Sequence, residues 1–157
     1  PIYCRQADNV LMDVNGALTK RKGYKSYTGS TAAGVRAAHR VQFETGTDTI
    51  LVVDGQTPKT LTAAGYGTIA GAGTIAPSDH ISMATYRNFV FLASGSTTLQ
   101  RWDGTTWTSY AAGSGAGQLP SGYTKPKFVE VFNNHMVLSG FNDSTPDRSA
   151  VFFGKLN

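Results

Sequence analysis

The sequence predicts an all-β fold in which antiparallel four-stranded units form a β-propeller or part of one. Three observations support this prediction. Short runs of β-branched and aromatic residues alternate with turn signals, and 18 of the 157 residues are glycine. Residues 81–110 have the pattern of four strands joined by three tight turns. Segments similar to parts of this unit recur on both sides of it along the chain.

The unit at 81–110 has the clearest signals. Its expected strands cover residues 81–86, 89–94, 97–102 and 105–110, and the turns are Arg87-Asn88, Gly95-Ser96 and Asp103-Gly104. Asp-Gly between two β-rich runs predicts a type I′ hairpin turn, which needs positive φ at both central residues. Apolar side chains alternate onto both faces of strand 89–94. We therefore expect this strand to be buried on both faces, as in stacked sheets.

Composition restricts the class of protein. The net charge is +4 and aromatic residues make up 11% of the chain, which is typical of folded rather than disordered chains. Cys4 is the single cysteine, so neither an internal disulfide nor a two-cysteine metal site can form. No apolar run approaches the roughly 18 residues that a membrane-spanning helix requires. We expect one all-β domain, or a fragment of one, without a membrane span.

Residues 1–39 are expected to form an N-terminal hairpin followed by a basic turn. The turn signal Asn15-Gly16 lies between two short apolar runs. A basic cluster follows it, consisting of Lys20, Arg21, Lys22 and Lys25. Residues 28–34 are small and polar, which predicts a loop, and residues 35–39 are predicted to form a short helix.

The rest of the chain is expected to form three blade-like repeats, at 40–76, 77–122 and 123–157, of which the last is incomplete. Outside the central unit, the expected strands are 41–43, 49–53, 57–63, 128–132, 135–139 and 150–155. Residues 64–76 and 111–122 are rich in glycine and alanine, which predicts connections between the repeats.

Internal similarity supports these repeats. Segment 132–139 resembles segment 86–93 at a distance of 46 positions, and segment 50–55 resembles segment 90–95 at 40 positions. A period of about 40 to 50 residues with four strands is typical of propellers; a β-sandwich also has regularly spaced short strands and is the alternative. Closed propellers typically have at least about four blades. We therefore expect that the chain is part of a longer protein or is completed by other chains.

The sequence contains no pattern typical of catalysis. His39, His80 and His135 are far apart and lack the spacing to acidic or cysteine residues that metal sites have. The Gly-rich stretch 65–71 is one residue too long for a dinucleotide fingerprint, which favours a linker. We expect no enzyme activity, no metal and no cofactor.

Two groups of residues are candidates for binding. Arg101, Trp102, Asp103 and Trp107 combine aromatic faces with hydrogen-bonding groups that can hold a sugar ring; alternatively, both tryptophans pack between blades. The basic cluster of Lys20, Arg21, Lys22 and Lys25 can contact DNA phosphates, and the alternative is a solvated turn.

Several short motifs resemble those of tailed-phage virion proteins. They are the opening phrase at 8–24, the strand Leu51-Val52-Val53-Asp54-Gly55, the turn Arg101-Trp102-Asp103-Gly104 with Trp107, and the ending at 151–157. Together they are similar to proteins of the tail nozzle (tail tubular protein B) and packaged-DNA-stabilisation type. The resemblance implies a β-propeller-bearing subunit of a ring at the tail tip or head–tail neck, with a DNA channel through the ring.

The expected function follows from this resemblance. It implies a structural subunit of a phage or prophage virion, made in the host cytoplasm and located in the tail or neck, that scaffolds a ring used in DNA ejection. The implied partners are copies of itself, other virion proteins and DNA contacted without base readout. The alternative is a carbohydrate-binding β-propeller that recognises a cell surface through Arg101, Trp102, Asp103 and Trp107.

Overall fold

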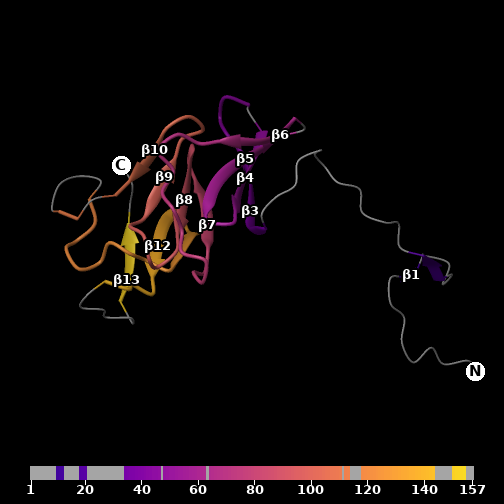
Figure 1. Cartoon of the computed structure of the whole chain (residues 1–157). Helices are drawn as coiled ribbons and strands as arrows, with labels where there is room; N and C mark the ends of the chain where they lie inside the picture. Colours follow the sequence, from indigo (N-terminus) through magenta and orange to yellow (C-terminus); the bar gives the residue numbers. More distant parts are fainter. Residues whose placement is uncertain are drawn as a thin grey trace, which may run out of the picture.

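The computed structural model describes residues 10–12, 18–20, 34–46, 48–62, 64–110, 112–113, 118–143 and 150–154. These residues form β-strands, turns and connections, and contain no helix (Figure 1). The strands make one two-stranded, two four-stranded and one three-stranded sheet, all with antiparallel pairing. The predicted all-β fold with antiparallel sheets is therefore confirmed.

Each sheet is a meander, in which strands that follow one another in sequence lie next to one another. The first sheet contains β3 (Val35–Gln42), β4 (Asp48–Asp54), β5 (Thr57–Thr62) and β6 (Gly65–Thr68). The second sheet contains β7 (Ser82–Tyr86), β8 (Phe89–Ala93), β9 (Gln100–Trp102) and β10 (Trp107–Ser109). The third sheet contains β11 (Phe128–Phe132), β12 (His135–Ser139) and β13 (Val151–Gly154). The predicted N-terminal hairpin pairs β1 (Val10–Met12) with β2 (Leu18–Lys20).

The three larger sheets stack in chain order, and the first strand of each sheet contacts the first strand of the next (Figure 1). His39 Nε2 of β3 lies 2.7 Å from Thr85 Oγ1 of β7. The Ser82 hydroxyl of β7 donates to the Val129 carbonyl of β11 at 3.0 Å and accepts from the Val129 N–H at 3.1 Å. The described sheets form an open series and do not close into a ring.

The second sheet is buried on both faces, as the sequence predicts for strand 89–94. Val90 and Leu92 belong to a core shared with the first sheet, and Phe91 and Ala93 belong to a core shared with the third sheet. None of these four side chains is more than 1% exposed. Burying a valine, leucine or phenylalanine side chain stabilises a fold by roughly 1.5–3 kcal/mol. The two cores therefore hold the three sheets together.

Two expectations for local structure are wrong. Residues 35–39 form part of strand β3 rather than a short helix, because β3 pairs along its length with the β-branched strand β4. Residues 65–68 form the edge strand β6 rather than a connection. A Cβ at Gly67 would lie against the Thr60 hydroxyl, so a larger residue there would require the Thr60 side chain to move.

The turns agree with the predicted chemistry at some positions and differ at others. Asn133 and Asn134 have φ values of 47° and 60°, as a type I′ turn requires, and Arg87-Asn88 forms a two-residue turn as predicted. The predicted type I′ turn at Asp103-Gly104 is wrong. Trp102 pairs with Trp107, so the loop has four residues, and only its glycine has positive φ. The Asp103 carboxylate accepts hydrogen bonds from the Thr105 and Thr106 N–H groups, which favours this wider loop.

Asp143 holds the segment that leads into the third sheet in place through hydrogen bonds. Its carboxylate accepts hydrogen bonds from the N–H groups of Thr124 and Lys125 at 2.9 and 3.0 Å, and from the Thr124 hydroxyl at 2.6 Å. Burial raises the pKa of Asp143, but these hydrogen bonds together outweigh burial and lower the pKa below its usual value.

This geometry predicts that Asp143→Asn reduces the pH dependence of stability. Because the folded pKa is the lower one, the stabilisation from Asp143 is present above the unfolded pKa and is lost as pH falls through the folded pKa. Urea unfolding at a series of acidic pH values measures the effect. We expect the wild-type chain to lose more unfolding free energy on acidification than the Asp143→Asn variant. An equal loss in both proteins would contradict the prediction.

Candidate assembly interface

The outer face of the third sheet carries large exposed apolar side chains, and we call it the open face. Phe128 and Phe132 of β11 are 44% and 70% exposed, and Val151 and Phe153 of β13 are 50% and 67% exposed. The strand pairing places three of its residues in one row, namely Glu130 of β11, Val137 of β12 and Phe153 of β13. Large exposed apolar side chains gathered on one sheet face make it a candidate interaction surface.

The internal repeat explains why this face is apolar. Phe132 and Val137 lie 46 positions after Tyr86 and Phe91, which occupy the same places in the second sheet. Tyr86 is 4% exposed and Phe91 is 0% exposed, because the third sheet covers both of them. The open face therefore corresponds to a face that a neighbouring sheet covers elsewhere in the same chain.

The outer face of the first sheet differs from the open face because it carries charged side chains that form ion pairs. Arg40 of β3 is exposed there and forms a bidentate ion pair with Asp48. Lys59 of β5 binds Asp54 at 2.8 Å and lies 5.8 Å from the ring centroid of Tyr66. This face is therefore more polar than the open face and carries two cationic side chains.

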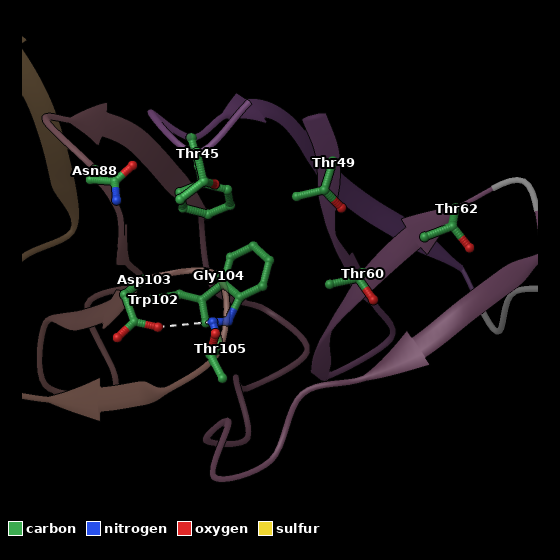
Figure 2. Close-up of a pocket in the computed structure, with 10 residues that line it drawn as sticks. Thr45, Thr49, Thr60, Thr62, Asn88, Trp102, Asp103, Gly104 and Thr105 are labelled. Carbon is green, nitrogen blue, oxygen red and sulfur yellow. Dashed lines mark hydrogen bonds between the residues drawn. The ribbon is translucent and has the colours of Figure 1, made fainter. Parts of the chain in front are cut away.

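A polar cleft lies between the first and second sheets (Figure 2). It has a volume of about 320 Å³. Its walls are Thr49, Thr60 and Thr62 from the first sheet and Asp103, Gly104 and Thr105 from the second, with Phe43, Thr45, Asn88 and Trp102 completing the lining. The sequence analysis missed this cleft, although Thr60 and Thr62 alternate along one expected strand. Hydroxyl groups around a cleft can hydrogen-bond a neutral polar ligand.

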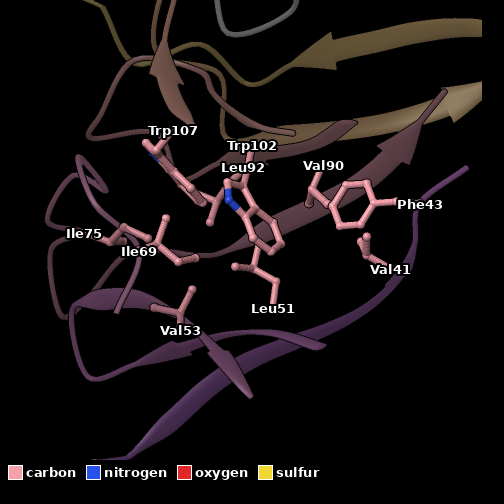
Figure 3. Packing of buried hydrophobic residues seen from close by; sticks show 10 residues of the cluster. All are labelled: Val41, Phe43, Leu51, Val53, Ile69, Ile75, Val90, Leu92, Trp102 and Trp107. Atoms are coloured by element: carbon pink, nitrogen blue, oxygen red, sulfur yellow. The ribbon is translucent and has the colours of Figure 1, made fainter. Parts of the chain in front are cut away.

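The structure separates the four residues predicted to bind sugar. Trp102 and Trp107 are 3% and 7% exposed and pack in the core between the first and second sheets (Figure 3). The Trp102 ring meets the Phe43 ring edge-on at 5.5 Å. Arg101 points to the opposite face, where its guanidinium lies 4.5 Å from the ring centroid of Phe89. Asp103 lies in the exposed loop beyond them, where backbone N–H donation from Thr106 lowers its pKa. Sugar binding by this group stays a prediction.

The two tryptophans differ in hydrogen bonding, which gives a matched test. Trp107 Nε1 donates to the buried Gln100 side-chain oxygen at 3.0 Å. Among the described residues, the buried Trp102 Nε1 has no hydrogen-bond partner. We expect Trp107→Phe to be less stable than Trp102→Phe by about 1–3 kcal/mol, because only the first change removes the donor from a buried acceptor. Chemical unfolding of both variants checks this, and equal stabilities would contradict it.

The basic cluster falls largely outside the described residues. Lys20 is the last residue of β2, and its side chain is not described. Arg21, Lys22 and Lys25 lie outside the described residues, so DNA-phosphate contact by this cluster stays a prediction. Within the described ranges, no group of three or more His, Cys, Asp or Glu side chains could hold a metal ion. The same ranges contain no helix long and apolar enough to cross a membrane.

Comparisons of this chain with protein-family models, with curated proteins and with solved structures found no match. The sheets and their exposed faces are therefore the basis on which a function is proposed.

Proposed function

We propose that this chain is a structural scaffold module of a phage or prophage particle, at the tail nozzle or head–tail neck. In this proposal the three sheets are successive blades of a β-propeller, and the open face joins them to a further β-sheet. The observation that supports the proposal most is the exposure of two phenylalanine side chains on the open face, since Phe132 is 70% and Phe153 is 67% exposed. Burying such side chains against a partner contributes favourable free energy in proportion to the apolar area covered.

The positions of the phage-like motifs support a structural role. Leu51 and Asp54 lie in β4, Arg101 and Trp102 lie in β9, and Val151 begins β13. These residues form strands, cores and turns in the described part of the chain. Residues in such positions maintain the fold and the packing contacts within it. DNA would pass such a module without base readout, attracted only by its modest positive charge.

Purified particles test the proposal. We expect mass spectrometry to find peptides of this chain in a fixed ratio to the tail proteins of tailed particles from the source host. Immunogold labelling should then place the chain at one end of the tail or at the neck. Particles that contain no peptides of this chain would overturn the proposal.

One observation favours carbohydrate binding as a second candidate function. The cleft between the first and second sheets is lined by five threonines and by Asp103, without a basic side chain. Such a lining suits the hydroxyl groups of a neutral sugar. Glycan-array binding that is lost in Thr60→Val would support this function, since Thr60 lines the cleft and is not part of either core. Absence of glycan binding by the intact protein would exclude it.

A further inference from the structure

We propose that a second cleft, at the junction of the second and third sheets, binds a sugar unit that carries a carboxylate group, such as a hexuronic acid. The proposal goes beyond the scaffold function and does not depend on it. Three observations support it: the place and size of the cleft, the chemistry of the side chains that line it, and the hydrogen bonds that hold its walls.

The cleft lies at the strand ends opposite the β7–β8 and β11–β12 turns. Its walls are residues 78–80, which lead into β7, residues 94–95, which follow β8, residues 127–128, at the start of β11, and residues 140–142, which follow β12. It shares no lining residue with the cleft between the first and second sheets. Its volume is about 420 Å³. Small-molecule sites typically have volumes of about 300–1,000 Å³, so this cleft has room for a sugar unit.

Phe128 presents an aromatic face to this cleft. Its side chain is 44% exposed, and its ring packs over the backbone of Gly140, where a Cβ would come within 3.0 Å of Phe128 Cδ2. The centroid of the His80 ring lies 5.2 Å from that of Phe128. Contacts with Gly140 and His80 therefore hold the Phe128 ring while part of it stays accessible. An aromatic face in this position can pack against the apolar C–H face of a pyranose ring.

The internal repeat does not account for this phenylalanine. By strand register, Phe128 takes the place of Ser82, because Phe128 pairs with Ser139 as Ser82 pairs with Ala93. The Ser82 hydroxyl forms hydrogen bonds with the backbone of the third sheet, a role that a phenylalanine cannot take. Phe128 therefore differs from Phe132, which repeats the aromatic Tyr86. A ligand that stacks on the Phe128 ring gives a reason for this side chain.

Lys127 supplies a positive charge beside the same ring. Its side chain is exposed, and its ammonium group lies 5.8 Å from the centroid of the Phe128 ring. A ligand that stacks on Phe128 can therefore place a carboxylate against Lys127. Such a charge-assisted hydrogen bond is stronger than one between neutral groups. Lys127 is the feature that distinguishes this cleft from the threonine-lined one and that selects an acidic sugar.

The remaining polar side chains suit the hydroxyl groups of a sugar. The Asn142 amide can donate and accept hydrogen bonds, and the Ser78 hydroxyl can do the same. The Asp79 carboxylate accepts a hydrogen bond from the Ser96 hydroxyl, and a carboxylate has acceptor sites for further donors. The lining thus offers a partner to each part of an acidic sugar: its carboxylate, its hydroxyl groups and the apolar face of its ring.

Backbone hydrogen bonds hold the walls of the cleft. The Lys127 N–H donates to the Ser139 carbonyl at 3.1 Å, and the Asn142 N–H donates to the Lys125 carbonyl at 3.0 Å. Lys125 is itself held by Asp143, whose carboxylate accepts from its N–H. Because these bonds fix the backbone that carries the cationic and amide side chains, binding requires little ordering of the chain.

Nuclear magnetic resonance titration of the full chain tests the proposal, with glucuronic acid as the probe. We expect glucuronate to shift the amide resonances of residues 78–80, 127–128 and 140–142. Glucose has the ring without the carboxylate, and acetate has a carboxylate without the ring. Each of these controls should bind at least about tenfold more weakly than glucuronate, because it lacks one of the two main contacts.

Two variants and two matched controls locate the site. Lys127→Gln should weaken glucuronate binding by about tenfold and leave glucose binding unchanged. Phe128→Leu keeps an apolar side chain without the flat ring and should weaken the binding of both sugars. Arg87→Gln makes the same charge change in the β7–β8 turn, at the opposite strand ends, and should bind glucuronate as the wild type does. Thr60→Val alters the other cleft and should also leave glucuronate binding unchanged.

Four outcomes would overturn the proposal. They are no binding of glucuronate, equal binding of glucuronate and acetate, glucuronate binding that Lys127→Gln leaves unchanged, and binding of inorganic phosphate as strong as that of glucuronate. The last of these would mean that a lone cation, without the ring of Phe128, accounts for binding. A chain that is present in virions but binds no glucuronate would refute only this inference. A chain that binds glucuronate but is absent from virions would refute only the proposed function.

Discussion

Phe91→Ala is expected to lower the free energy of unfolding by about 3–5 kcal/mol. Phe91 lies at the centre of β8 and is 0% exposed. Its ring centroid lies 6.4 Å from that of Phe89 and 6.2 Å from that of Tyr110, within the core between the second and third sheets. Truncation removes these contacts and leaves a cavity that two rigid sheets cannot close by moving together. The change therefore weakens the attachment of the third sheet.

Urea unfolding followed by circular dichroism measures this effect. Phe91→Leu is the control, because it keeps an apolar side chain of similar reach and should lose less stability than the alanine variant. Tryptophan fluorescence reports separately on the other core, since Trp102 and Trp107 both lie between the first and second sheets. A loss below about 1 kcal/mol in Phe91→Ala would contradict the prediction, because it would mean that the two sheets repack around the missing ring.

Arg36→Ala is expected to cost about 2–4 kcal/mol of unfolding free energy, since charge-assisted hydrogen bonds contribute roughly 1.5–3 kcal/mol each and are not additive. The Arg36 guanidinium donates to the carbonyls of Gly55, Ala76 and Asp79 at 3.1, 2.9 and 2.5 Å. It thereby joins the β4–β5 turn to the connection that leads into the second sheet. Alanine leaves all three carbonyls without this donor.

Two further variants make the Arg36 result specific. Arg36→Lys should recover only part of the stability, because an ammonium group cannot reach three divergent carbonyls as the planar guanidinium does. Arg87→Ala is the matched control. Arg87 lies in the exposed β7–β8 turn with its guanidinium over the Tyr86 ring at 5.4 Å, and its loss should change stability by about 0.5 kcal/mol or less. Thermal unfolding of the three variants side by side would contradict the prediction if Arg36→Ala and Arg87→Ala were alike.

Much of the fold could be predicted from the sequence where local pattern and tertiary environment agree. The alternation of apolar residues along 89–94 predicted a strand buried on both faces, and β8 is such a strand. The repeat at 46 positions correctly aligned β11 and β12 with β7 and β8. Phe132 and Val137 on the open face could have been identified from that same repeat, because their counterparts Tyr86 and Phe91 were already expected in a stacked sheet.

Other features could not be predicted because they depend on contacts between distant segments. Residues 35–39 contain alanines that are compatible with a helix, and pairing with β4 makes them a strand. Gly67 belongs to β6 because residues 65–68 pair with β5, where Gly67 lies opposite Thr60. The directions of Arg101 and Trp102, which follow one another in β9, place them on opposite faces of the second sheet. Arg36 shows no local signal for its three distant carbonyl partners.

The sequence by itself determined that the chain is all-β, that its strands come in antiparallel units of similar size, and that its second unit lies between two others. These properties follow from side-chain alternation and turn residues, which act over a few positions. Only the tertiary structure decided which faces are covered, because coverage depends on which sheets stack against one another. It left Phe132 and Phe153 exposed on the outer face of the third sheet, whereas Tyr86 and Phe91 on the corresponding face of the second sheet are buried.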